Sequence, residues 1–145
     1  MTYQNVTERI REILTSHAML RMVLFNSPQE WLKSRGEYDL PICCFTVNTG
    51  SFEPGLKTFN VDFWFLDKSG AEAEFETYVA SDMLEVANDI LSKLRQSHIY
   101  PWTTELVSNF EIISDRFEDY LAGVKMSVTI KTVNKYDACS FPSNS

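Results

Sequence analysis

The chain has 145 residues, of which 44% are hydrophobic and 13% aromatic. This length suits one domain, and the apolar content is enough for a buried core, which excludes a largely disordered protein. The formal net charge is −7, so the surface repels nucleic-acid phosphates and binding to DNA through a basic patch is not expected.

The first segment, Thr2 to Leu20, has helical periodicity. Its apolar positions recur every three or four residues with charged residues between them, which predicts an amphipathic helix. A short second helix is expected from Ser27 to Gly36, because a proline at position 28 suits the first turn of a helix. The apolar positions of the first helix are Val6, Ile10, Ile13, Leu14 and His17.

Two β-rich runs follow. Pro41 to Asn48 is rich in strand-forming residues, and Lys57 to Leu66 alternates apolar with polar side chains, which predicts a half-buried strand. The turn-forming residues between them, Asn48 to Gly55, predict a long hairpin loop that projects from the body. The apolar face of the second strand would hold Phe59, Val61, Phe63 and Phe65.

The strongest helical pattern covers residues 81–96. Ser81 is a favoured N-cap residue, and an apolar stripe follows it. The preceding run, Ala71 to Tyr78, fits either an extension of the strand or an entry into the helix. The stripe consists of Met83, Val86, Ala87, Ile90, Leu91 and Leu94.

Two further strands complete the pattern. Leu106 to Ser114 and Val124 to Thr132 both alternate apolar and polar residues, and a charged connection, Asp115 to Tyr120, joins them. Gly123 suits a bulge or a tight entry to the last strand. We expect helix 81–96 to pack on the apolar face of that strand, Val124 to Ile130.

The element order is therefore helix, hairpin, helix and two strands. It predicts an α+β fold in which an antiparallel sheet of about four strands carries the helices on one face. Residues 1–133 would form this single domain, and residues 134–145 an extended C-terminal tail.

No catalytic or cofactor-binding motif is visible. The five glycines form no phosphate loop or dinucleotide fingerprint, and two isolated histidines without a Cys-x-x-Cys pair argue against zinc. Glu72, Glu74 and Glu76 fit a metal site less well than a solvated acidic segment before a helix. We predict that the protein is not an enzyme and needs no metal or cofactor.

The cysteines indicate a reducing compartment. Their number is odd, and Cys43 and Cys44 are adjacent, so in a strand they would point to opposite faces. Neither this count nor this spacing suits a disulfide framework. No segment is long and apolar enough for a membrane span, and the polar first ten residues are unlike a signal peptide.

Three stretches carry a resemblance to a known family. They are SDMLEVANDIL at 81–91, DRFEDYLAG at 115–123, and Asp137 to Cys139 followed by Pro142. With the helix-first layout they resemble a group of short virion proteins from tailed phages and prophages of Bacteroidetes, including crAss-like phages. The likeness spans nearly the whole chain. The topology is similar to that of tail-terminator and tail-completion proteins, which form rings at the head–tail junction.

The resemblance implies a structural subunit of the virion neck or tail, assembled in the cytoplasm of the host bacterium. The subunit would form a homo-oligomeric ring between portal or connector and tail proteins, with DNA only passing through the channel. The family offers no catalytic residues. The alternative is a phage accessory protein-binding module that acts as a monomer.

Two sets of residues are candidates for a role in such a ring. For Trp64 and Leu66, coverage by the segment around Trp31 or by the tail is an equal alternative to a subunit contact. For the 115–119 turn, ion pairs within the turn are an equal alternative to a contact between subunits. Acidic channel walls would keep DNA from adhering. The candidate subunit contacts are Phe52, Trp64, Leu66, Arg116, Phe117 and Asp119. The candidate lumen-facing acids are Glu53, Glu72, Glu74 and Glu76.

Overall fold

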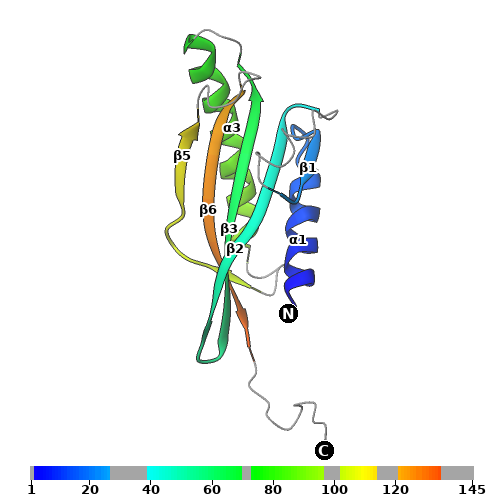
Figure 1. Cartoon of the computed structure of the whole chain (residues 1–145), viewed down its shortest axis with the longest axis vertical. Coiled ribbons are helices and arrows are strands. Elements are labelled where there is room, and N and C mark those ends of the chain that lie inside the picture. The colour runs from blue at the N-terminus through cyan, green and yellow to red at the C-terminus, as the bar shows by residue number, and fades with distance from the viewer. Residues whose placement is uncertain (1, 27–38, 70–72, 97–101, 114–120, 135–145) are drawn as a thin grey trace, which may run out of the picture.

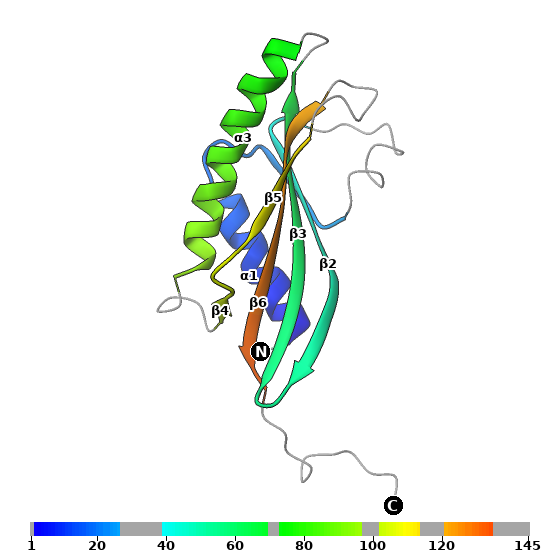
Figure 2. The ribbon, with the colours of Figure 1, turned by 90° about the vertical axis from the view of Figure 1, so that its left-hand side faces the viewer.

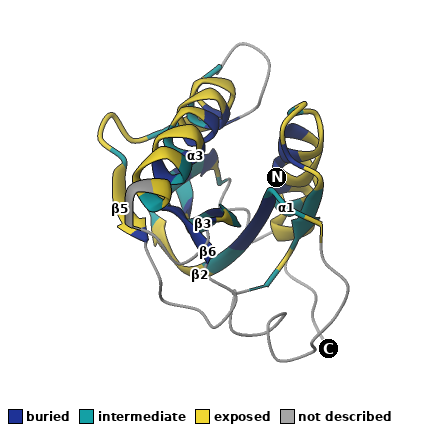
Figure 3. Ribbon diagram, turned by 90° about the horizontal axis from the view of Figure 1, so that it is seen from above, coloured by how far each residue is buried: buried dark blue, intermediate teal, exposed yellow. Residues whose placement is uncertain are grey.

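The computed structural model describes residues 2–26, 39–69, 73–96, 102–113 and 121–134. Within these ranges six strands form one sheet, and two helices lie on one of its faces (Figures 1 and 3). The α+β class and the one-sided helix layer are confirmed. The elements are α1 (Tyr3–Thr15), β1 (Met22–Leu24), β2 (Ile42–Glu53), β3 (Leu56–Lys68), α3 (Ala73–Leu94), β4 (Thr103–Thr104), β5 (Asn109–Ile113) and β6 (Leu121–Val133).

The sheet is larger than the sequence predicts. The strand order is β1-β2-β3-β6-β4, and β5 also pairs with β6, so the number of about four strands is too low. β1 runs parallel to β2, while the other pairs are antiparallel. Strands of two or three residues, such as β4 and β1, are too short to show a two-residue period.

The first helix is shorter than expected. The Thr2 side chain accepts a hydrogen bond from the Asn5 N–H at 3.1 Å and caps the start of α1. The helix ends at Thr15 instead of Leu20, so His17 lies beyond it. Nε2 of His17 is 2.9 Å from Oδ2 of Asp89, which links the end of α1 to α3. His17 is partly buried, but it lies beyond α1 and not on the apolar side of that helix, so its predicted place in the helix is wrong.

The second described helix is longer than expected. α3 begins at Ala73, so the acidic run leads into the helix, and Ser81 is an interior residue and not its N-cap. The predicted apolar stripe does face the sheet. Its buried members join the apolar face of β6 in one core, which confirms the predicted packing; they are Met83, Val86, Ala87, Ile90 and Leu94.

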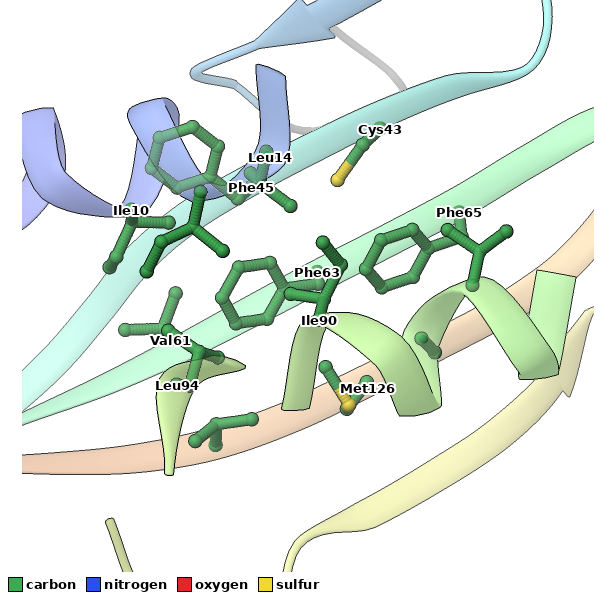
Figure 4. Close-up of a cluster of buried hydrophobic side chains, with 14 of the residues drawn as sticks. Ile10, Leu14, Cys43, Phe45, Val61, Phe63, Phe65, Ile90, Leu94 and Met126 are labelled. Carbon is green, nitrogen blue, oxygen red and sulfur yellow. The ribbon is translucent and has the colours of Figure 1, made fainter. Parts of the chain in front are cut away.

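The main core lies between the helices and the sheet (Figure 4). The rings of Phe45 and Phe63, and of Phe63 and Phe65, stack with 6.1 Å between their centroids. α1 contributes Ile10 and Leu14 from the other helix (Figure 4). The alternation predicted for β3 and β6 is confirmed, because each inward-facing residue is buried.

A second, smaller core lies on the opposite face of the sheet. It consists of Ile42, Cys44, Leu66, Ile113 and Leu121. The expectation that this face is polar is therefore wrong at one end of the sheet, where β2, β3, β5 and β6 bring apolar residues together. Cys43 belongs to the main core and Cys44 to the second, so the two do point to opposite faces.

The predicted long hairpin loop is wrong. β2 and β3 remain paired up to Glu53 and Leu56, and only Pro54 and Gly55 form the turn. Gly55 has a φ of 75°, a conformation that glycine adopts without steric cost. The pairing register shifts between Val47 and Thr49, so a β-bulge absorbs the extra residue.

Several predicted segments lie outside the described residues. These are the short helix at Ser27 to Gly36, the charged connection at Asp115 to Tyr120, and the tail beyond Asn134. The division into a domain at 1–133 and a tail stays a prediction.

Candidate functional site

The end of the β2–β3 hairpin projects beyond α1 (Figures 1 and 2). We call residues 48–58 the hairpin arm. Phe52 near its tip is 76% exposed, and its cross-strand partner Lys57 lies on the same face. A hollow of about 310 Å³ separates this face from Tyr3 at the start of α1.

The hairpin arm is held firmly in the sheet. The Ser51 N–H donates to Oγ1 of Thr58 at 3.0 Å. The Thr132 hydroxyl donates to the Lys57 carbonyl at 3.1 Å, and the Asn134 N–H donates to the Gly55 carbonyl at 2.9 Å. β6 thus supports the arm as a third strand almost to its turn, so the exposed Phe52 sits on a rigid projection.

A second apolar surface lies between α3 and β5. We call it the α3–β5 groove. A cavity of about 480 Å³ has Leu84, Ala87 and Leu91 of α3 on one side and Leu106, Val107 and Phe110 on the other, with Met126 also lining it. A smaller hollow of about 340 Å³ lies next to the α3–β5 groove. Leu84 lines both, and Ile112 of β5 lines the smaller one.

The alternation of β5 explains why this groove is apolar. Ile113 points to the second core, so Phe110 and Ile112 point to the opposite face, where the helices lie. No helix among the described residues covers β5 on that face (Figure 3). Leu106 consequently remains 94% exposed and Phe110 57% exposed.

The sequence indicates apolar residues in this region but not their exposure. The alternation of Leu106, Phe110 and Ile112 predicts a buried strand face, and only the positions of the helices leave it open. Leu84 and Val107 carry no separate signal in the sequence. For this reason none of the groove residues is among the subunit contacts predicted from the sequence.

The remaining polar face of the sheet satisfies many of its own hydrogen bonds. Asp62 accepts from the Ser127 hydroxyl at 2.7 Å and from the Asn48 amide. The Asn60 side chain bonds Thr129 at 2.9 Å. Because these groups are already paired across strands, this face is a weaker candidate for adhesion than the arm or the groove.

The predicted contact residues differ in their exposure to solvent. Phe52 is exposed as expected. Leu66 is fully buried in the second core, so its assignment to an exposed contact patch is wrong. Trp64 is half-buried beside that core, and the Lys125 Nζ lies 5.4 Å from its ring centroid, so it is partly covered. Arg116, Phe117 and Asp119 lie outside the described residues.

Among the predicted lumen-facing acids, the two whose side chains the structure describes are Glu53 and Glu76, and these lie in different parts of the molecule. Glu53 is in the hairpin arm, with an oxygen 3.9 Å from the Nζ of Lys131. Glu76 lies in the first turns of α3, at the opposite end of the molecule (Figure 1). Glu72 lies outside the described residues, and for Glu74 only its place in α3 is described. Glu53 and Glu76 therefore do not form a shared acidic wall within one subunit.

The described ranges contain no grouping of three or more His, Cys, Asp or Glu side chains that could hold a metal ion. They also contain no helix of the length and apolarity required to cross a bilayer. Burial raises the pKa of the Cys43 thiol well above its usual range, with a smaller contribution from Cys44, which keeps Cys43 protonated and unreactive.

We expect folding to be independent of metal ions. Dialysis against a chelator should leave the melting temperature unchanged, because the described core consists of apolar side chains and not of metal ligands. Differential scanning calorimetry before and after dialysis measures this. A drop of several degrees, reversed by adding back a divalent metal, would contradict the prediction.

No protein-family model matches the sequence, and a search of curated proteins gives no match. The hairpin arm and the α3–β5 groove are two exposed apolar surfaces that could bind a partner.

Proposed function

We propose that the protein is a structural virion subunit of a tailed phage, which assembles with copies of itself into a ring in the neck or tail. A ring closed by rotation uses heterologous interfaces, in which two different surfaces of the same chain meet. The observation that carries the proposal is the presence of two such surfaces, the hairpin arm and the α3–β5 groove, in separate parts of the molecule (Figures 1 and 2).

The exposed apolar area supports association over an isolated monomer. Leu106, Val107, Phe110 and Ile112 lie close together in the sequence and are all exposed. Monomeric proteins rarely leave a contiguous apolar patch of this kind in water, because its burial contributes about 25 cal/mol per Å². A partner surface that removes it from water is therefore favoured.

The viral setting is supported by the resemblance of the three stretches to short virion proteins. The helix-first layout of the sequence is part of the same resemblance, which extends to tail-terminator and tail-completion proteins. In this proposal the neighbours in the particle are portal or connector and tail proteins, and DNA passes through the ring without being bound.

Oligomeric state tests the proposal. Size-exclusion chromatography with light scattering should give one closed oligomer at high protein concentration, and negative-stain microscopy should show rings with a central hole. A protein that remains monomeric at all concentrations would contradict the ring and favour the phage accessory module that binds another protein through the same groove.

A further inference from the structure

We infer that the hairpin arm of one copy docks into the α3–β5 groove of the next copy, with Phe52 as its apolar anchor. This inference rests on the proposed ring and names the surfaces that close it. Such a contact is heterologous, because a projection meets a groove, so each copy offers one of each and the contacts can close into a ring.

The groove has the properties of an acceptor site. It is lined mainly by apolar residues, with Leu84, Leu91 and Phe110 on its walls, and β5 is an edge strand. Edge strands with exposed apolar residues pair or associate readily unless charges or prolines protect them. The only charged residue of β5 is Glu111, which lies opposite Lys125 of β6.

The hairpin arm has the properties of the occupant. Phe52 is the most exposed aromatic residue among the described ones. The pairing of the arm with β6 fixes its conformation before binding, so little conformational entropy is lost when it docks. Aromatic side chains on a preorganised projection are frequent anchors of protein interfaces.

Charge supports this pairing of surfaces. Lys57 lies beside Phe52 on the same face of the arm. Of the described residues that line the groove, two are charged. Arg95 donates to the Leu106 carbonyl at 2.9 Å, whereas Glu85 is exposed and forms no ion pair among the described residues. Insertion of Phe52 would bring the Lys57 ammonium group towards this carboxylate.

The two surfaces of one copy cannot meet each other. Phe52 and Lys57 lie at the level of Thr132 in β6, on the β3 side of that strand. The groove lies on the other side of β6, where its residue Leu106 follows Glu105, whose N–H donates to the Thr129 carbonyl. Three strand residues separate these levels, roughly 10 Å along the strand, and β3 and β6 lie between Phe52 and the groove. Because the arm is paired with β6, it cannot fold back into its own groove, so the occupant must be a second copy.

Crosslinking between two different variants tests the contact directly. Both carry Cys139→Ser; one adds Pro54→Cys, an exposed turn residue that leaves Phe52 in place, and the other adds Val107→Cys. Mixed under mild oxidation, they should form a disulfide-linked heterodimer. The pair Pro54→Cys with Tyr78→Cys is the matched control, since Tyr78 is exposed on α3 outside the groove. Equal crosslinking of both pairs, or none with Val107→Cys, would overturn the inference.

A charge exchange gives an independent readout. Lys57→Glu and Glu85→Lys should each weaken self-association at least about tenfold in sedimentation equilibrium, and the double variant should recover most of it. Phe52→Ala should also weaken assembly, whereas Phe75→Ala, an exposed aromatic elsewhere on α3, should not. Unchanged circular dichroism would show that each variant remains folded.

The results of these experiments distinguish a failure of the arm–groove contact from a failure of the proposed ring. If wild-type rings form but Phe52→Ala and the charge variants assemble normally, the ring stands and the arm–groove contact is wrong. If the wild-type protein is monomeric, the ring itself is wrong, and this contact fails with it.

Discussion

Gly123→Ala should destabilise the protein strongly. An added Cβ at Gly123 would lie 1.8 Å from the backbone carbonyl oxygen of Phe65, far inside van der Waals contact. The obstacle is the backbone of β3, a strand paired on both sides, and not the end of a flexible side chain. We expect the free energy of unfolding to fall by about 3 kcal/mol or more, or the protein to be insoluble.

Urea denaturation followed by circular dichroism measures this effect, at one fixed protein concentration because assembly adds to apparent stability. Gly50→Ala is the matched control. Its Cβ would also approach a carbonyl across the strands, that of Thr58, at 2.4 Å. Gly50 lies in the hairpin arm, so we expect a smaller loss that is confined to the arm. A Gly123→Ala protein as stable as the wild type would contradict the register of β3 and β6.

Ile90→Ala should destabilise the protein by about 2–5 kcal/mol. Ile90 is 1% exposed and lies over the stacked rings of Phe63 and Phe65 (Figure 4). Its truncation removes apolar contacts and leaves a cavity, because the β-sheet below it cannot collapse into the space. The same denaturation experiment measures the loss.

Tyr78→Ala on the same helix is the control for Ile90→Ala. Tyr78 is 68% exposed, so its removal should change the free energy of unfolding by no more than about 0.5 kcal/mol. Equal effects of the two substitutions would show that the stripe of α3 does not face the sheet in solution.

The sequence alone determines the main core of this protein. The period of two in β3 and β6 and the period near four in α1 and α3 each mark one apolar face, and every such face packs into the same core. Local periodicity is sufficient here, because each element is long enough to show its period and has a single face to bury.

The candidate surfaces required more than local pattern. The turn-forming residues 48–55 would form a loop in isolation, yet pairing of β3 with the end of β6 extends both strands of the hairpin through them. Leu66 alternates as an outward-facing residue, but strand pairing places Ile113 and Leu121 on the same face, and together they form the second core. Both results depend on residues more than 40 positions away, as the pairings show.

Exposure of the α3–β5 groove is likewise decided by the tertiary structure alone. The alternation of β5 predicts that Phe110 and Ile112 share a face. It does not predict whether a helix lies above that face. α3 packs over β3 and β6 and leaves β5 uncovered on that side. The sequence therefore determines which residues are apolar and how they alternate, and the placement of two helices on a sheet of six strands decides which of them remain in contact with water.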